Sequence, residues 1–164
     1  MPLDVRPVLY APGKILNFEI HPDWSDLEFV GRFPVTRSVT VSGTVSNHAG
    51  ALTLEFNIST ILDAQCDRCG KIFPLEKEIS DFCVLAEEVQ DENQDEIVLI
   101  QDGQADIETL ARDAFILSMD TKILCRPDCK GLCPKCGADL NLGPCGCPDA
   151  EPDPRWAVLS SLLE

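Results

Sequence analysis

Features that would place the chain in a membrane or outside the cell are missing from the sequence. No stretch of about 18 apolar residues is present, so no helix is expected to cross a bilayer. The first residues, Met1–Arg6, contain an early acidic residue and no apolar core, which argues against a secretory signal peptide. We therefore expect a protein of the reducing cytoplasm, where cysteine thiols persist and bind metal instead of oxidising.

Motifs for catalysis are also lacking. The only two histidines, His21 and His48, lie beside turn-forming residues and far from the cysteines along the chain. The H-x-E signature of zinc deaminases is absent, and so are the G-x-S-x-G motif, the P-loop and the dinucleotide fingerprint. We therefore expect a protein that is not an enzyme and that has no catalytic residue and no small-molecule substrate.

Positive charge is scarce, because 13 Lys and Arg residues oppose 28 Asp and Glu residues, for a net charge of −15. A surface of this sign repels a nucleic-acid backbone over most of its area. One segment reverses the balance: between residues 121 and 136 a single acid, Asp128, faces four cations, Lys122, Arg126, Lys130 and Lys135. Two interpretations stay open. The cations either offset a zinc–thiolate centre, which is formally −2 with four thiolates, or form a face that contacts RNA phosphate.

Cysteine is abundant and is arranged in close pairs. Eight of the nine cysteines form four pairs: Cys66 with Cys69, Cys125 with Cys129, Cys133 with Cys136, and Cys145 with Cys147. Two pairs supply one tetrahedral thiolate site, so four pairs predict two structural zinc sites, with a single site as the alternative. Four thiolates leave no open position for water or substrate. Glycine follows both C-x-x-C motifs and accepts the positive φ that such a turn requires.

Other uses of the thiols stay open at this point. Disulfides are the main alternative, although the spacing and the expected compartment favour metal. Thiol redox chemistry and a rubredoxin-like iron site are further alternatives, since a C-x-x-C motif can act as a dithiol or bind iron. The ninth cysteine, Cys83, lies between Phe82 and Val84 and is interpreted as a small buried apolar residue.

The four pairs can share two metals in three ways. Loop closure favours a local site, because the last two pairs lie within fifteen residues and little chain entropy is lost in gathering them. The first two pairs then form a long-range site. The rival arrangement joins the two C-x-x-C-G motifs, as zinc ribbons do. The preferred groups are therefore Cys66, Cys69, Cys125 and Cys129 in one site, and Cys133, Cys136, Cys145 and Cys147 in the other.

Alternation of apolar and polar residues predicts a β-rich body. Residues 39–46 and 52–59 alternate on either side of a turn at 47–50, which predicts a long antiparallel hairpin. The other expected strands are residues 3–10 and 14–20 around a Pro12-Gly13 turn, residues 72–85 with a bulge, and the short run 97–100.

The rest of the chain is expected to contain an acidic loop at 87–96 and a helix at about 106–119 that Asp106 caps. A short last helix should begin at Asp153-Pro154, and its Trp156 and Leu159 are candidates for docking a partner. We expect an α+β fold with a mainly antiparallel sheet and one central helix in residues 1–120. A cysteine-rich zinc-binding tail at 121–150 and a C-terminal helix at 151–164 that packs on the body should follow.

The stretch Leu124–Asn141, which reads LCRPDCKGLCPKCGADLN, is more particular than a generic zinc knuckle. Together with Cys145-Gly146-Cys147 and the closing DPRWAVL at 153–159, it closely resembles the bacterial YceD family. Upstream features agree: the Gly43-Thr44-Val45 strand, the first C-x-x-C turn, the acidic loop and the Asp106-Ile107 helix start. The resemblance covers residues 35–164.

The resemblance implies a non-enzymatic factor of ribosome biogenesis that supports accumulation of large-subunit ribosomal RNA. The implied partner is the precursor of the large ribosomal subunit, reached through ribosomal protein, ribosomal RNA or both. The charge distribution suggests that the acidic body holds a basic ribosomal protein, while the cations between Lys122 and Lys135 contact RNA. The competing class is a plain protein-interaction module without RNA contact, anchored by Trp156 and Leu159.

Overall fold

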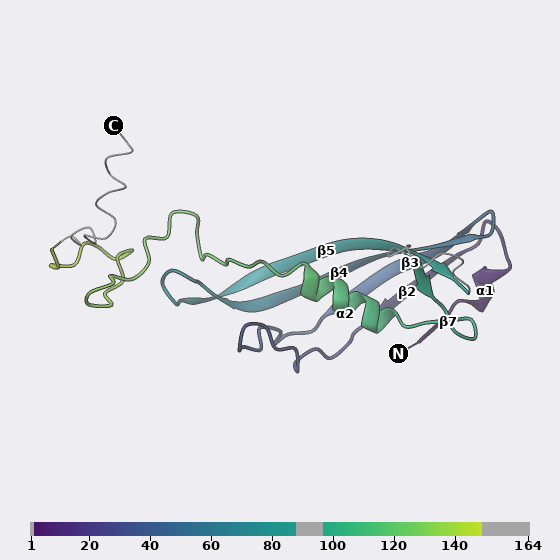
Figure 1. Ribbon diagram of the computed structural model, residues 1–164, viewed down its shortest axis with the longest axis horizontal. Coiled ribbons are helices and arrows are strands. Elements are labelled where there is room, and N and C mark those ends of the chain that lie inside the picture. The colour runs from purple at the N-terminus through teal and green to yellow at the C-terminus, as the bar shows by residue number, and fades with distance from the viewer. Residues whose placement is uncertain (1, 88–96, 149–164) are drawn as a thin grey trace, which may run out of the picture.

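The structure, a computed structural model, describes residues 2–87 and 97–148 (Figure 1). Strands β2 to β6 form one sheet in sequential order, and β1 pairs with β7 in a small second sheet. Every strand pair is antiparallel except β5 with β6. The expected α+β class with a mainly antiparallel sheet is confirmed. The elements are β1 (Leu3–Asp4), α1 (Arg6–Leu9), β2 (Ile15–Ile20), β3 (Thr40–His48), β4 (Ala51–Gln65), β5 (Ile72–Ala86), β6 (Ile97–Leu99), β7 (Gln104–Ala105) and α2 (Ile107–Leu117).

The predicted hairpin around residues 47–50 is present as β3 and β4. Its register runs from His48 opposite Ala51 to Thr40 opposite Ser59. The two turn residues, Ala49 and Gly50, both have positive φ, at 53° and 99°. Such a two-residue turn matches the right-handed twist of the strands that it joins.

The predicted bulge in the third strand is wrong. Strands β4 and β5 pair without interruption from Leu52 opposite Leu85 to Gln65 opposite Ile72. The apolar pattern loses its phase because apolar residues occupy both faces of β5. Leu75 packs against the core, whereas Phe82 lies on the opposite face and is 65% exposed.

The N-terminal strand prediction is also wrong beyond Asp4, because the next residues form the short helix α1. Pro7 cannot donate to a strand ladder but is tolerated in the first turn of a helix. The buried residues Val5 and Val8 are three apart, which places them on one side of that turn. The buried amide of Asn47 donates to the carbonyls of Val8 and Leu9 at 2.7 and 2.9 Å, and so fixes α1 to the end of the hairpin.

Helix α2 covers one face of the sheet (Figure 1). It begins as predicted, since the Asp106 side chain accepts a hydrogen bond from the Thr109 N–H at 3.3 Å. It ends at Leu117, two residues before the expected end, where the Ser118 hydroxyl donates to the Phe115 carbonyl. Buried residues from the sheet, α2 and the loop after β2 share one core: Val41 and Val45, Leu54 and Ile58, Ile107, Ala111 and Phe115, and Trp24 and Leu27.

The loop after β2 is anchored by Trp24, whose ring lies 5.2 Å from that of Phe115 between centroids, with the planes at 52°. Cys83 is half-buried against the same core, and burial raises the pKa of its thiol to about 11. No helix in the described ranges is long and apolar enough to cross a bilayer. The acidic stretch 88–96 and the predicted C-terminal helix, with Trp156 and Leu159, lie outside the described residues.

Candidate metal centres

The first cysteine group gathers Cys66, Cys69, Cys125 and Cys129. All four sulfur atoms lie within 4.8 Å of one another. The first C-x-x-C motif is the turn between β4 and β5, and the other pair follows α2, so the group ties the end of the sheet to the segment after the helix (Figure 1). The Sγ atoms of Cys66 and Cys129 are 3.8 Å apart, as are those of Cys69 and Cys125.

The second cysteine group gathers Cys133, Cys136, Cys145 and Cys147, whose sulfurs also lie within 4.8 Å of one another. It belongs entirely to the segment after α2. The grouping is therefore the one that loop closure favours, with one local and one long-range site. The ribbon-like arrangement, which would join the two C-x-x-C motifs, is absent from the described residues.

The two C-x-x-C turns share one hydrogen-bond pattern. In the first, Gly70 donates its N–H to the Cys66 carbonyl at 2.8 Å; in the second, Gly137 donates to the Cys133 carbonyl at the same distance. The glycines have φ of 71° and 73°, which confirms the positive φ expected after each motif. The chain therefore builds the same turn twice, once at the end of the sheet and once in the tail.

Backbone N–H groups converge on the first sulfur of each motif, from the turn itself at Cys133 and from both the turn and the segment after α2 at Cys66. Backbone N–H groups of Cys125 and Cys69 lower the pKa of Cys66 to about 6. Those of Cys136 and Lys135 do the same for Cys133, whose pKa is also about 6. Hydrogen bonds to the charged form favour it, so these N–H groups stabilise a thiolate at Cys66 and at Cys133, the form in which cysteine binds metal.

The sulfurs that face these thiolates show the opposite effect. Burial and the neighbouring thiols raise the pKa of Cys125 to about 12, and contact with Cys136 raises the pKa of Cys147 to about 12. Four negative sulfurs cannot share so small a space without a cation. The charge of a bound metal ion is therefore what would let every sulfur of a group ionise.

The geometry fits a tetrahedral metal. A zinc–sulfur bond of about 2.3 Å places the sulfurs of a tetrahedron roughly 3.8 Å apart, whereas a disulfide requires about 2.05 Å. The 3.8 Å separations of Cys66 from Cys129 and of Cys69 from Cys125 match the first value. All nine cysteines are free thiols. Four sulfurs per group would complete the coordination of a zinc ion, so the arrangement suits a structural centre.

The two groups are joined by a short, closely packed link. Arg68, in the first turn, donates to the Cys129 carbonyl at 2.7 Å and accepts from the Leu132 N–H at 3.2 Å. Gly131, buried between the two groups, has φ of 74°, and a Cβ at this position would lie 2.9 Å from the Arg68 carbonyl oxygen. Only glycine fits here, so the first turn and the tail meet backbone to backbone.

Asn141 supports the first group from the tail. Its side-chain oxygen accepts from the Lys130 N–H at 2.8 Å, and its amide donates to the Cys129 sulfur at 3.5 Å. Asp67 supports the group from the other side, since its backbone N–H donates to the Ile123 carbonyl and its carboxylate accepts from the Ile123 N–H. The sequence analysis missed these roles of Arg68, Asn141 and Asp67. The positions within or beside cysteine motifs were the available signal.

The four predicted RNA-contact cations all lie on the surface of the cysteine region, which we define as residues 66–71 and 121–148. Arg126 is engaged within the region, because it donates to the Asn141 side chain at 2.8 Å and faces Asp128 at 3.4 Å. Lys135 donates to the Pro148 carbonyl at 2.8 Å. Lys122 and Lys130 are exposed. Arg68 and Lys71 add two cations that sequence reasoning did not include.

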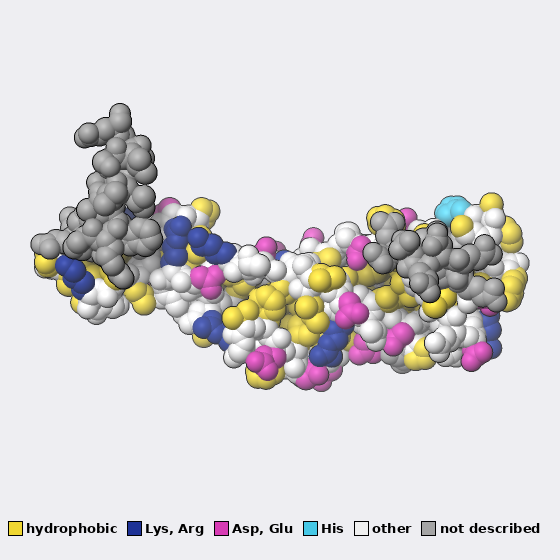
Figure 2. Space-filling model, in the orientation of Figure 1, with side chains coloured by type: hydrophobic (Ala, Val, Ile, Leu, Met, Phe, Trp, Pro, Cys, Tyr) yellow, Lys and Arg dark blue, Asp and Glu magenta, His cyan; other side chains and the backbone are white. Residues whose placement is uncertain are grey.

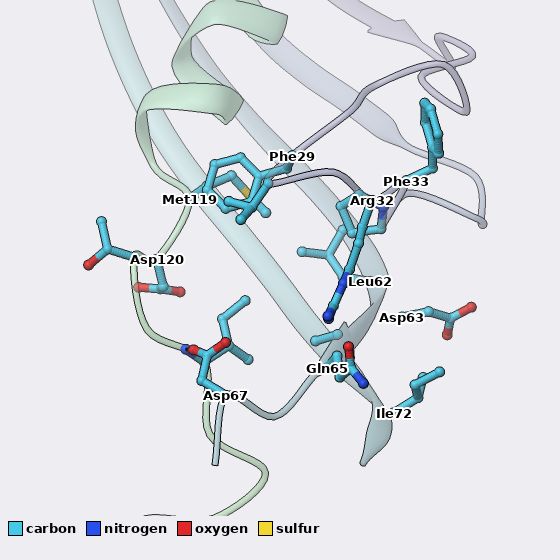
Figure 3. A pocket seen from close by; sticks show the side chains of 15 residues that line it. Phe29, Arg32, Phe33, Leu62, Asp63, Gln65, Asp67, Ile72, Met119 and Asp120 are labelled. Atoms are coloured by element: carbon cyan, nitrogen blue, oxygen red, sulfur yellow. Dashed lines mark hydrogen bonds between the residues drawn. The ribbon is translucent and has the colours of Figure 1, made fainter. Parts of the chain in front are cut away.

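A cavity of about 470 Å³ lies beside the first cysteine group, between the loop at residues 29–34, the end of β4 and the linker at 119–123 (Figure 3). Three carboxylates at its rim have partners. Asp63 accepts from the Thr36 hydroxyl at 2.6 Å, Asp67 binds the linker, and Asp120 faces Lys77 at 3.1 Å. These carboxylates fasten the surrounding loop and the linker to β4, to β5 and to the turn between them.

Comparison with known proteins matches residues 54–163 to the family model "Large ribosomal RNA subunit accumulation protein YceD". The chain is 41% identical over 70 residues to an uncharacterized protein of Mycobacterium tuberculosis, a match that covers 43% of this chain and 33% of the relative. It is 28% identical over 163 residues to a "Large ribosomal RNA subunit accumulation protein YCED homolog 1, chloroplastic" of Arabidopsis thaliana, covering 80% of this chain and 50% of that protein.

The protein of the same name in Zea mays is 29% identical over 147 residues, which cover 70% of this chain and 50% of the relative. The chain thus spans between a third and a half of the length of these relatives. No solved structure matches it.

Proposed function

The chain belongs to the YceD family, and on that basis we propose that it is a non-enzymatic, zinc-binding factor that supports accumulation of large-subunit ribosomal RNA. The observation that carries the zinc part of the proposal is the pair of four-cysteine groups. Each has the number, type and spacing of ligands that a structural zinc ion requires. The ribosomal part rests on the match to the family model and on the names of the plant relatives.

The partner in this proposal is the precursor of the large ribosomal subunit, and the chain is proposed to meet it in a reducing compartment such as the cytoplasm. The charge distribution supports a division of labour. The cysteine region contains six of the 13 Lys and Arg residues and three of the 28 Asp and Glu residues. The acidic body suits a basic ribosomal protein, and the cysteine region suits RNA phosphate.

The distribution of charge on the surface supports this proposal. In Figure 2 acidic side chains are scattered along the body, and a group of Lys and Arg side chains lies where the body meets the cysteine region. The zinc ions would fix this basic end in one shape, since the segment after α2 has few apolar side chains to bury. We propose that the body, the zinc-binding tail and the C-terminal residues 151–164 act as three parts of the chain.

Complementation of a strain depleted of the protein tests this function. Wild-type protein should restore the ratio of large-subunit to small-subunit ribosomal RNA. The double variant Lys122→Glu with Lys130→Glu should restore less, and its association with precursor particles should weaken. The matched control, Lys14→Glu with Arg32→Glu, makes the same change in charge on the body and should behave as wild type.

Salt dependence separates RNA contact from plain protein docking. Phosphate contacts should make association with precursor particles fall steeply with salt, and the slope should be shallower for the Lys122 and Lys130 double variant. Unchanged association of this variant with the particles would defeat the proposed RNA contact. A failure of wild-type protein to restore the ribosomal RNA ratio would defeat the proposed function as a whole.

A further inference from the structure

The far edge of β5 is a long, open sheet edge. Strand β5 pairs with β4 from Ile72 to Leu85, but β6 covers only Val84–Ala86 on the other side. The twelve residues 72–83 therefore have no strand partner at that edge among the described residues. Unpaired backbone groups along an edge are a ready template for an added strand.

The register shows which residues point their backbone groups outward. Cys66 donates its N–H to the Lys71 carbonyl at 2.9 Å, so this pair is hydrogen-bonded, and bonded and non-bonded pairs alternate along the ladder from there. Odd-numbered residues of β5 thus face β4, and even-numbered ones face away. At the other end of β5 the Ala86 carbonyl accepts from the Ile100 N–H, which agrees with that assignment.

Three consecutive outward positions, Glu76, Glu78 and Ser80, offer both an N–H and a carbonyl. The fourth, Phe82, offers its carbonyl, because its N–H donates to the Asp81 carboxylate at 2.8 Å. Pro74, the preceding outward position, has no N–H and ends the usable stretch. The side chains of these four residues lie on the sheet face opposite α2, and all four are exposed. An added strand would place its own alternate side chains on that face, opposite two carboxylates and then a serine and a phenylalanine.

We propose that this edge binds an extended, basic protein segment, which adds to the sheet as a strand beside residues 76–82. The inference rests on the proposed function, because it locates the surface through which the acidic body takes up a basic partner. Backbone hydrogen bonds would supply affinity, and Glu76 and Glu78 would select Lys or Arg at alternate positions of the segment. The exposed ring of Phe82 would accept an apolar side chain at the end.

The charges of the edge decide against other occupants. A second copy of this chain would bring two more glutamates to the edge, and no Lys or Arg lies at an outward position of residues 72–83 to neutralise them. RNA would be repelled by the same carboxylates. Charged residues and Pro74 protect the edge from self-association, while they leave it open to a strand of opposite charge.

The test measures binding of a short fluorescein-labelled peptide, in which lysine alternates with threonine, to the full zinc-loaded chain by fluorescence anisotropy. The variant Ser80→Pro removes one outward N–H, which leaves the ladder between β4 and β5 intact. The proline ring and the lost hydrogen bond should weaken binding about tenfold.

The opposite edge of the sheet supplies the matched control. The Lys14 carbonyl accepts from the Asn47 N–H, so this pair is hydrogen-bonded. The backbone N–H and carbonyl groups of odd-numbered residues of β2, including Asn17, therefore point away from β3. Asn17→Pro therefore makes the same change at the other edge and should leave peptide binding unchanged. Equal weakening by Ser80→Pro and Asn17→Pro would overturn the proposal.

Two further readouts separate strand addition from general attraction between opposite charges. Hydrogen exchange at the amides of Glu76, Glu78 and Ser80 should slow when the peptide is bound. A second peptide carries a methyl group on the backbone nitrogen of each lysine, so it keeps its charge but loses the backbone N–H groups that would face β5. It should bind at least about tenfold more weakly. Unchanged exchange at these amides, or equal affinity of the two peptides, would contradict the proposal.

Charge is tested by Glu76→Gln with Glu78→Gln, against the control Glu19→Gln with Glu55→Gln on the same face away from the edge. The first pair should weaken binding more than the second; equal effects would refute edge recognition. A dimer of the wild-type chain that Ser80→Pro converts to monomer would instead assign the edge to a second copy.

The same variants in the depleted strain keep the two proposals apart. If wild-type protein restores the ribosomal RNA ratio and Ser80→Pro restores it equally well, the proposed binding at the β5 edge is refuted while the proposed function stands. If wild-type protein does not restore the ratio, the proposed function fails, whatever the peptide measurements show. Restoration by wild type and by Asn17→Pro, but not by Ser80→Pro, is the result that we expect.

Discussion

The sheet body and the cysteine region are stabilised by different chemistry. The body buries a continuous apolar core that α2, the sheet and the loop after β2 share. The cysteine region buries mainly its own sulfur, at Cys66, Cys129 and Cys133, whereas its leucines are exposed or only partly buried, with Leu142 89% exposed. The body could fold by burying apolar surface, but the cysteine region has too little of it to offset the entropy of an ordered chain. One chain thus depends on two independent sources of stability.

The largest expected effect comes from removing one sulfur from either group. Cys129→Ser should abolish the first centre and lower bound zinc from two equivalents to one. The segment after α2 should then separate from the turn between β4 and β5, while the NMR signals of the sheet persist. A structural zinc ion contributes an apparent free energy of about 10–16 kcal/mol in zinc-finger peptides. Metal analysis and NMR spectra of the body and tail residues measure the outcome.

Two further variants sharpen that prediction. Cys136→Ser should remove only the second centre and leave the hydrogen bonds between Arg68 and Cys129 in place. Cys83→Ser, which removes the one cysteine outside both groups, should leave the zinc content at two equivalents. Loss of zinc on changing Cys83, or global unfolding of the sheet with Cys129→Ser, would show that the two regions are not independent.

The converse experiment removes apolar volume from the body. Phe115 is fully buried against Trp24, so Phe115→Ala should lower the free energy of unfolding by about 3–5 kcal/mol. Zinc content should stay at two equivalents below the lowered melting temperature. Denaturant titration with parallel metal analysis checks both statements, and release of zinc from the second group in the folded variant would contradict them.

The two regions also differ in how much of their structure could be predicted from the sequence. The strands of the hairpin and the start of α2 were predictable, because alternation of residues such as Val41 and Val45 and the cap at Asp106 act locally. The helix at Arg6–Leu9 was not, since its position depends on the contact with Asn47, far along the chain. The helix propensity of four residues stabilises a helix less than such a tertiary contact does.

In the cysteine region the grouping of the eight sulfurs followed from pair spacing and loop closure alone. The contacts that join the two groups did not, because Arg68 and Gly131 meet across more than sixty residues of chain. The open edge of β5 was also hidden, since alternation defines the two faces of a strand but says nothing of which neighbours cover its edges.

A smaller effect is expected at the link between the groups. Gly131→Ala combines a positive φ with a clash against the Arg68 carbonyl, and should cost about 2 kcal/mol. Gly137→Ala has nearly the same φ but no atom within 4 Å of the added Cβ, so it should cost only about 1 kcal/mol. Chelator-induced unfolding compares the two; equal costs would mean that contact with Arg68 contributes nothing.

The smallest predicted effect lies in the body, at the cap of α2. Hydrogen bonds from Thr109 lower the pKa of Asp106, so the contribution of this carboxylate is fully present above its unfolded pKa of about 3.9 and is lost as the pH falls through the lower folded value. Asp106→Ala should destabilise the protein by about 1 kcal/mol at neutral pH, and by less in acid. Asp113→Ala, on the exposed side of the helix, is the control and should change stability by less than about 0.5 kcal/mol. Melting curves at neutral and acid pH distinguish them, and a cost of Asp106→Ala that did not shrink in acid would argue against the cap.

The metal content of the full chain, purified under reductant and measured by mass spectrometry of the elements alongside thiol titration, is the most direct test. The account predicts two zinc ions per chain, with eight thiols protected from alkylation until a chelator is added and Cys83 unaffected by the chelator. Protein without stoichiometric metal, or with sulfur–sulfur bonds among the eight paired cysteines, would contradict it.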